Sequence, residues 1–207
     1  MTGEMADSLK ELLSQRSPDN DIWLFAYGSL MWHPEISFDL SVRATIYGYQ
    51  RNFCLWSTEH RGTDELPGLV LGLEPGTFCV GRAFRIPLVD HEPQLARIWA
   101  REMVTGAYHP KWVQLKTSSG TIEAIAFLVN LDHPKYVGTC LTKELKAKRI
   151  LEAKGKRGSC YEYIKQTVQF LRAEKIDDDN LESLYQEVRK IKSIKSCLLQ
   201  LDRTNSV

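Results

Sequence analysis

A glutamate on the apolar side of a predicted helix is the first candidate for chemistry in this sequence. Residues 91–103 have helical periodicity, and Leu95, Ile98 and Trp99 form the apolar stripe at i, i+3 and i+4. The next member of this stripe, at i+7, is Glu102. Burial raises the pKa of a carboxyl toward neutrality, which suits a group that transfers protons at pH 7. The alternative is a structural glutamate near the helix end, partly solvated and paired with a neighbouring cation. The candidates for that cation are Arg101, Arg85 and Lys111.

A glycine-containing loop directly follows the first predicted strand. The apolar run Trp23–Tyr27 leads into Gly28, Ser29 and Leu30. Glycine lets the backbone turn sharply and approach a ligand, and successive exposed N–H groups in such a turn form an anion-binding concavity. With the Ser29 hydroxyl as a further donor, the loop would suit a carboxylate. From these residues alone, a plain turn whose glycine serves only geometry is the alternative.

Two charged segments offer further candidates. In residues 59–63, between two predicted strands, Arg61 could hold a substrate carboxylate and His60 could act as a base, but a solvated hairpin tip fits equally well. Residues 143–157 carry seven Lys/Arg against two Glu, which would suit nucleic acid or an acidic partner. Such runs are usually the solvated face of a surface helix. Because no aromatic interleaving accompanies this one, no nucleic-acid partner is expected.

Metal and thiol chemistry have little support in the sequence. The five cysteines are scattered and form no C-x-x-C pair, and no two of the five histidines are spaced i, i+4. Neither a metal nor a cofactor is therefore expected. Free thiols and a polar, acidic N-terminus without signal-peptide character indicate the cytoplasm. The cysteines lie at positions 54, 79, 140, 160 and 197.

Composition places the chain among soluble globular proteins. It has 207 residues, of which 43% are hydrophobic and 26% charged, and its formal net charge is +1. This balance excludes collagen-like, disordered and coiled-coil classes and argues against a histone-like binder. No run reaches the roughly 18 apolar residues of a membrane span, so no membrane partner is expected.

The elements that must position these residues change in character along the chain. Strands are predicted at 22–27, 42–55, 67–73, 78–86, 111–117 and 120–130, with turns at 62–64, 74–76 and 118–120. Helices are predicted at 5–15, 91–103, 142–153, 159–175 and 180–199, with Asp90 as an N-cap. Strands first and helices later favour an α+β fold over a doubly wound one. We expect an N-terminal helical extension over residues 1–20, one domain over 21–177 and a packed C-terminal helix over 178–207.

Four segments, in chain order, resemble the ChaC family of γ-glutamylcyclotransferases. Residues 25–32 match the family's F-x-Y-G-S-L-x-W, and residues 57–63 with Pro67-Gly68 match its S-T-x-H-R-G-T stretch and P-G turn. Residues 101–108 match its R-E-x-x-x-G-x-Y segment, and residues 155–163 match a glycine-containing turn that ends in Glu-Tyr. The resemblance covers about residues 22–175. It implies a small mixed, β-barrel-like cyclotransferase fold with flanking and C-terminal helices.

The resemblance also implies roles for individual residues. Glu102 matches the family's catalytic acid/base, and the loop Tyr27, Gly28, Ser29 and Leu30 matches its cradle for the α-carboxylate of the γ-glutamyl group. Arg61 and Tyr163 match residues that line the substrate pocket. One departure concerns the pocket rim, because the asparagine often found three residues before the tyrosine is Cys160 here.

The activity implied is cyclisation of the γ-glutamyl group of glutathione to 5-oxoproline, with release of Cys-Gly. Neither cofactor nor metal is implied, and the expected partner is the small-molecule substrate, on a monomer or weak dimer. Two alternatives remain open: a cyclotransferase of the same fold for other γ-glutamyl amines or amino acids, and a non-catalytic protein that retains the ligand pocket.

Overall fold

The computed structural model describes residues 3–16, 21–138 and 140–204. By its internal contacts the chain divides into two compact units. The first comprises residues 1–51 and 72–136, and the second residues 52–71 and 137–207. The predicted boundary at residue 20 falls on residues outside the described ranges. No helix among the described residues is long and apolar enough to cross a membrane.

A closed five-stranded barrel is the framework of the first unit. The strands follow the order β1-β3-β2-β4-β5, and the barrel closes where β5 pairs with β1. The pairing of β1 with β5 is parallel, and the pairings of β1 with β3, β2 with β4 and β4 with β5 are antiparallel. Their bounds are β1 Ile22–Ala26, β2 Leu40–Ser57, β3 Gly68–Ile86, β4 Tyr108–Thr117 and β5 Gly120–Val129. Residues 52–57 of β2 and 68–71 of β3 belong to the second unit.

The first strand is short, apolar and flanked on both sides. It pairs with β3 from Ile22↔Ile86 to Ala26↔Arg82, and with β5 at Leu24↔Ile125. A strand with neighbours on both edges has its backbone hydrogen-bonding groups satisfied within the sheet, so an apolar run such as 22–26 can be buried there.

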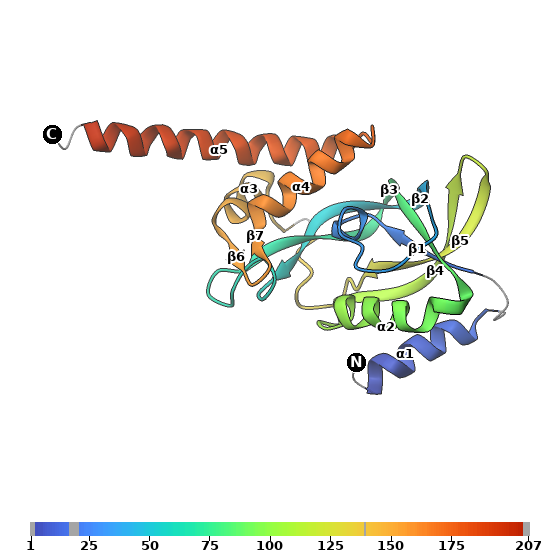
Figure 1. Cartoon of the computed structure of the whole chain (residues 1–207). Coiled ribbons are helices and arrows are strands. Elements are labelled where there is room, and N and C mark those ends of the chain that lie inside the picture. The colour runs from blue at the N-terminus through green and yellow to red at the C-terminus, as the bar shows by residue number, and fades with distance from the viewer. Residues whose placement is uncertain (1–2, 17–20, 139, 205–207) are drawn as a thin grey trace. The chain divides into compact units, whose positions relative to one another are not determined.

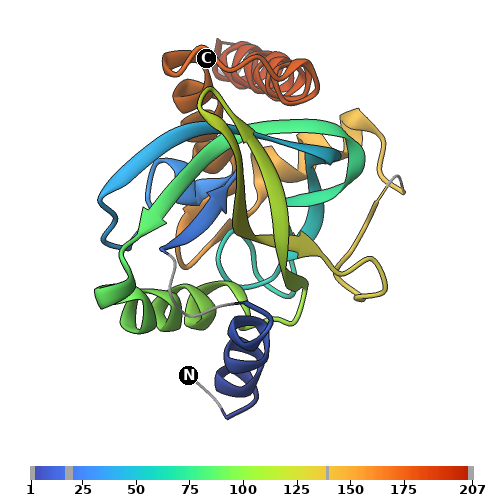
Figure 2. The same ribbon diagram turned by 90° about the vertical axis from the view of Figure 1, so that its right-hand side faces the viewer.

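Two helices accompany the barrel in this unit. Helix α2 (His91–Glu102) lies beneath the strands, and α1 (Gly3–Ser14) lies beside α2 (Figures 1 and 2). The last turn of α1 is held against the sheet, because the Trp112 indole on β4 donates a hydrogen bond to the Leu12 carbonyl at 2.9 Å. Asp90 occupies the predicted N-cap position of α2, although its side chain makes no capping hydrogen bond.

The second unit is mainly helical. The long helix α5 lies along α3 and α4 (Figure 1). Side-chain hydrogen bonds begin the two shorter helices, because Thr142 accepts from the Leu145 N–H and Ser159 accepts from the Glu162 N–H. The elements are α3 Lys143–Glu152, β6 Lys154–Gly155, β7 Gly158–Ser159, α4 Cys160–Ala173 and α5 Asp179–Thr204.

The α+β class and the barrel are therefore confirmed, whereas the turn predicted at residues 74–76 is wrong. Strand β3 continues through Glu74, Pro75 and Gly76. Glu74 is buried there and accepts hydrogen bonds from the Gln50 amide at 3.2 Å and the Tyr136 hydroxyl at 3.1 Å. Gly76 serves a close approach, since a Cβ atom on it would lie 2.5 Å from Gln50 Cγ.

Gly81 on β3 generates a prediction about the barrel. A Cβ atom at this position would lie 2.2 Å from the Ala26 carbonyl oxygen, a backbone atom that cannot rotate away. Gly81→Ala should therefore lower the free energy of unfolding by about 1–3 kcal/mol, as overpacking does. Urea denaturation measures this. Gly3→Ala is the matched control, because a Cβ atom there meets nothing within 4 Å. Equal stability of the two variants would contradict the prediction.

Candidate functional site

The loop after β1 is held at its first residue by two hydrogen bonds. The Tyr27 side chain is buried and its hydroxyl donates to the Phe127 carbonyl on β5 at 2.8 Å. The Tyr27 carbonyl accepts from Arg51 Nη1 at 2.7 Å, and Arg51 also donates to the Val80 carbonyl. These contacts fix the direction in which the chain enters Gly28. Tyr27 thus anchors the predicted cradle to the barrel through its side chain.

A short 3₁₀ turn, η1 (Ser29–Met31), forms the loop itself. The Met31 N–H donates to the Gly28 carbonyl at 3.0 Å, and the His33 N–H donates to the Ser29 carbonyl at 2.8 Å. Leu30 and Met31 are buried, so they hold the turn against the unit, while Ser29 is half-buried. The N–H groups of Ser29 and Leu30 precede the first hydrogen bond of the turn, so neither has a partner within it. This geometry suits the anion cradle predicted from the sequence, and that role stays a prediction.

Glu102 is the last residue of α2. The stripe residues Leu95, Ile98 and Trp99 are almost fully buried, as the periodicity predicts, and the Glu102 side chain is 17% exposed. The structure also contains the pairing named as the alternative, because Arg101 Nε lies 3.1 Å from Glu102 Oε1. Of the other two cations considered, Arg85 pairs with Asp39 at 2.7 Å, and Lys111 lies on β4. Burial and pairing therefore occur together at this carboxylate.

Arg101 brings the glutamate and the loop together. Its Nη2 donates to Ser29 Oγ at 2.7 Å while its Nε faces Glu102. One guanidinium group thus contacts both the predicted acid/base and the predicted carboxylate cradle. From the sequence, Arg101 was predicted only as a possible partner of Glu102 and as part of the R-E-x-x-x-G-x-Y match, and Arg51 was not predicted. The sequence signal for Arg51 is its place as an arginine inside a predicted strand. The structure shows that this arginine is buried, as a charged side chain is only when it has partners.

Arg61 and Tyr163 lie together in the second unit. The Arg61 guanidinium carbon is 5.0 Å from the centre of the Tyr163 ring, and Arg61 Nη1 donates to the Arg157 carbonyl at 2.5 Å. Tyr163 is buried on α4, with its ring edge against Phe53 at 5.6 Å between centroids. The two predicted pocket residues of this unit therefore contact each other. The structure also brings two of the matching segments into contact.

Backbone contacts join those two segments, residues 57–63 and 155–163. The Lys156 N–H donates to the Glu59 carbonyl and the Arg157 N–H to the His60 carbonyl, each at 2.9 Å. A Cβ atom on Gly155 would lie 2.5 Å from the Glu59 oxygen. Only glycine permits so close an approach of the two backbones, which then places Arg61 beside α4.

Cys160, the departure from the family pattern, is a buried thiol at the start of α4. Its Sγ donates to the Leu69 carbonyl at 2.8 Å. Burial raises the pKa of the Cys160 thiol to about 12, so it stays protonated at neutral pH. A protonated thiol is a poor nucleophile, and this residue therefore has a packing role.

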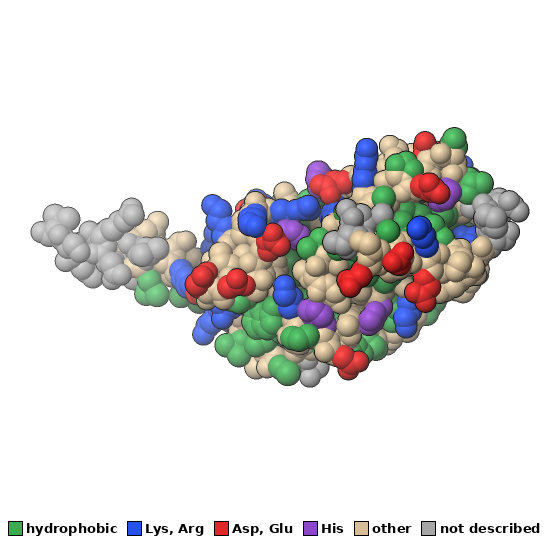
Figure 3. Space-filling view, turned by 90° about the horizontal axis from the view of Figure 1, so that it is seen from below, with side chains coloured by type: hydrophobic (Ala, Val, Ile, Leu, Met, Phe, Trp, Pro, Cys, Tyr) green, Lys and Arg blue, Asp and Glu red, His purple; other side chains and the backbone are tan. Residues whose placement is uncertain are grey.

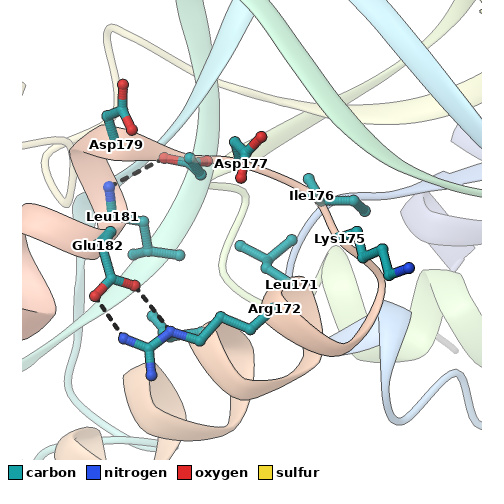
Figure 4. A pocket seen from close by; sticks show the side chains of 10 residues that line it. Leu171, Arg172, Lys175, Ile176, Asp177, Asp179, Leu181 and Glu182 are labelled. Atoms are coloured by element: carbon teal, nitrogen blue, oxygen red, sulfur yellow. Dashed lines mark hydrogen bonds and ion pairs between the residues drawn. The ribbon is translucent and has the colours of Figure 1, made fainter.

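A separate hollow of about 340 Å³ lies at the junction of α4 and α5 (Figure 4). Three of its charged side chains have partners, because Arg172 pairs with Glu182 at 2.5 Å and Asp178 accepts from the Leu181 N–H at 3.0 Å. The described residues contain no group of three or more His, Cys, Asp or Glu that could hold a metal ion. We therefore assign no second chemical site to this hollow.

Comparison with known proteins agrees with this architecture. A solved yeast γ-glutamylcyclotransferase specific to glutathione superposes with a TM-score of 0.77 at 24% identity, covering 83% of this chain and 97% of the yeast chain. The fold is therefore that of a γ-glutamylcyclotransferase.

Sequence comparison adds the family. The profile of ChaC-like proteins matches residues 22–191. The glutathione-specific γ-glutamylcyclotransferase of Escherichia coli K12 is 37% identical, over 91% of this chain and 81% of its own length. The glutathione-specific γ-glutamylcyclotransferase 1 of Danio rerio is 33% identical, over 87% of this chain and 94% of its own length. The chain belongs to the ChaC-like protein family.

The buried thiol generates a prediction about stability at alkaline pH. Because the Cys160 pKa is about 12 in the folded protein against 9.0 for a solvated thiol, the unfolded chain ionises first. The contribution of this thiol to stability is therefore constant below pH 9 and falls as the pH rises from 9 toward 12. The slope should approach about 1.4 kcal/mol per pH unit.

Urea denaturation of the wild type and Cys160→Ala at pH 7, 9 and 10.5 measures this slope. The variant starts from a lower stability, because it loses packing, but it should lose less stability between pH 9 and 10.5. Parallel curves for the two proteins would refute the assignment.

Proposed function

We propose that this protein is a γ-glutamylcyclotransferase specific for glutathione, which it converts to 5-oxoproline and Cys-Gly. The observation that carries the proposal is the guanidinium of Arg101, which contacts Ser29 Oγ on one side and Glu102 Oε1 on the other. The predicted acid/base carboxylate thus lies beside the loop predicted to bind an amino-acid head group. The names of the relatives supply the substrate class.

The reaction is an intramolecular aminolysis. The α-amino nitrogen of the glutamyl group attacks its own γ-carbonyl carbon, and a five-membered lactam forms through a tetrahedral intermediate. The bond from that carbon to the cysteinyl nitrogen then breaks. The nucleophile is already attached to the electrophile, so much of the entropic cost is absent, and effective molarities of about 10⁵ M and above are known for such attacks.

Glu102 handles the protons of this reaction. The substrate's ammonium group must lose a proton before its nitrogen can attack, and Glu102 accepts it. The same carboxyl then donates that proton to the departing cysteinyl nitrogen. The attacking nitrogen loses a second proton as the lactam forms, and the released amine takes up a proton to become an ammonium, so the overall reaction neither consumes water nor releases a proton.

The remaining predicted residues bind the substrate. The N–H groups of the loop Tyr27–Leu30 and the Ser29 hydroxyl hold the α-carboxylate and so fix the bent conformation of the glutamyl group. Arg61 binds a substrate carboxylate, and Tyr163 supports its guanidinium from the ring face. Arginine suits this task because its planar fork of donors matches a carboxylate.

Some charged side chains of residues 143–157 have partners within the second unit. Lys156 pairs with Glu59 at 2.8 Å, and Glu152 within the segment pairs with Lys195 at 2.7 Å. Arg149 packs over the Trp56 ring at 5.6 Å. Acidic and basic side chains are interspersed on the face seen in Figure 3. At least one of its cations, Lys156, is thus paired, and we propose no nucleic-acid partner for this segment.

The compartment proposed is the cytoplasm. All five cysteines are free thiols, three of them buried and two exposed. Exposed thiols persist in a reducing environment, where glutathione is itself kept reduced.

The substrate is tested directly by incubating the purified protein with glutathione and following 5-oxoproline and Cys-Gly by mass spectrometry. We expect the two products in equal amounts, and kcat/KM values at least about tenfold lower for γ-glutamyl amino acids and γ-glutamylamines. Faster turnover of those compounds would favour the alternative cyclotransferase. Calorimetric binding of glutathione without product would favour a ligand-binding protein.

The role of Glu102 is tested by Glu102→Gln. The amide keeps the shape of the side chain and an oxygen that can accept from Arg101, but it cannot exchange the proton. We expect kcat to fall at least about 100-fold with folding and glutathione binding retained. Circular dichroism and calorimetry provide the controls. Product formation at the wild-type rate would show that Glu102 is not the acid/base.

A further inference from the structure

The Arg101 side chain is only 9% exposed, although it carries a permanent charge. It lies beside the proposed active site and reaches three neighbouring segments. Its contacts are Ser29 Oγ at 2.7 Å, the His33 carbonyl at 2.9 Å, Glu35 Oε2 at 2.7 Å and Glu102 Oε1 at 3.1 Å.

The contact with Ser29 has a defined direction. Guanidinium nitrogens are donors only, so Ser29 Oγ must accept the hydrogen bond from Arg101 Nη2. The hydroxyl hydrogen of Ser29 then points away from Arg101. A serine whose lone pair is engaged in this way is set up to donate, which is what a bound carboxylate requires.

The contact with Glu102 is not a default of sequence adjacency. Consecutive side chains on a helix do not face each other, so Arg101 must fold toward Glu102 Oε1 at the end of α2. The other side of the guanidinium is fixed by Glu35 and the His33 carbonyl. A rigid, planar group held in this way also fixes the Glu102 oxygen that it contacts.

We propose that Arg101 is a positioning residue of the reaction: it sets the Ser29 hydroxyl as a donor to the substrate's α-carboxylate and holds the Glu102 carboxylate within reach of the α-amine. This inference rests on the proposed function. The Ser29 hydroxyl and the Glu102 carboxylate, which would act on neighbouring atoms of one amino-acid head group, are thus both held by the same guanidinium.

A purely structural role is the competing explanation, because Arg101 also ties down residues 33–35. The two explanations differ in whether the effect of Arg101 on substrate binding depends on the Ser29 hydroxyl. If it positions Ser29, then its effect on substrate binding requires the serine hydroxyl. If it only stabilises the loop, then the two substitutions act independently.

The test is a double-mutant cycle with Arg101→Lys and Ser29→Ala, in which KM and kcat for glutathione are measured for each variant. Lysine keeps the charge but lacks the planar fork, so it cannot hold both partners in the same geometry. We expect Arg101→Lys to raise KM and to lower kcat, each by about tenfold, as small misplacements in active sites do. In the Ser29→Ala background, the KM effect of Arg101→Lys should shrink to less than about twofold, while its kcat effect should persist.

A second readout is chemical rescue. Guanidinium chloride at concentrations below denaturation should restore part of the activity of Arg101→Ala, and it should not restore Glu102→Gln. Arg85→Ala is the matched control, since Arg85 also pairs with a carboxylate of the same unit, that of Asp39, and should retain wild-type KM and kcat. Thermal melting gives the folded fraction of every variant. If Arg101→Ala does not fold, the Arg101→Lys cycle alone decides.

The inference is overturned if Arg101→Lys has wild-type KM and kcat, or if its KM effect is equally large with and without the Ser29 hydroxyl. These results are distinguishable from failure of the proposed function. An active Glu102→Gln enzyme would remove the acid/base assignment, whereas an inactive Glu102→Gln with an unaffected Arg101→Lys would remove only the positioning role.

Discussion

The position of the loop that begins at Tyr27 depends on where strand β1 ends. This strand pairs with β3 on one side and with β5 on the other, so its position along the barrel is fixed by both neighbours. The close approach of Gly81 to the Ala26 carbonyl fixes the last residue of the strand, and Tyr27 and Arg51 fix the next step of the chain. A loop proposed to bind an amino-acid head group through its backbone needs this rigidity, because backbone donors cannot adjust by changing rotamer.

The remainder of the first unit is organised around the same point. Helix α2 buries Leu95, Ile98 and Trp99. Glu102 is the next position of the same stripe and the last residue of the helix. The helix therefore serves packing along most of its length, and its C-terminus carries the proposed acid/base. Arg101, one residue earlier, links this terminus to the loop after β1, although the two are about 70 residues apart in the chain.

Periodicity predicted much of this fold, and the reasons are local. Helix α2 was expected at 91–103 and lies at His91–Glu102, because its apolar stripe and polar remainder leave one orientation only. The predicted turn at 74–76 failed because Pro75 and Gly76 are read locally as a turn, whereas the long-range contacts of Glu74 with Gln50 and Tyr136 carry the strand onward. The candidate site was predicted from the motifs at Ser29 and Glu102, and the structure brings both residues to Arg101. Their roles stay predictions. The roles of Arg51 and Arg101 could not be predicted, because each depends on which distant backbone or hydroxyl group lies opposite the guanidinium.

The buried state of Cys160 has a consequence for a protein proposed to handle a thiol peptide in large excess. Mixed disulfides form through a thiolate, and a thiol with a pKa of about 12 provides almost none at neutral pH. Cys54 and Cys79 are likewise buried, so the barrel and the start of α4 are shielded from glutathionylation, and only Cys140 and Cys197 are exposed to it. Oxidation of the surrounding glutathione pool would therefore modify the periphery of the chain and leave the thiols of its core reduced.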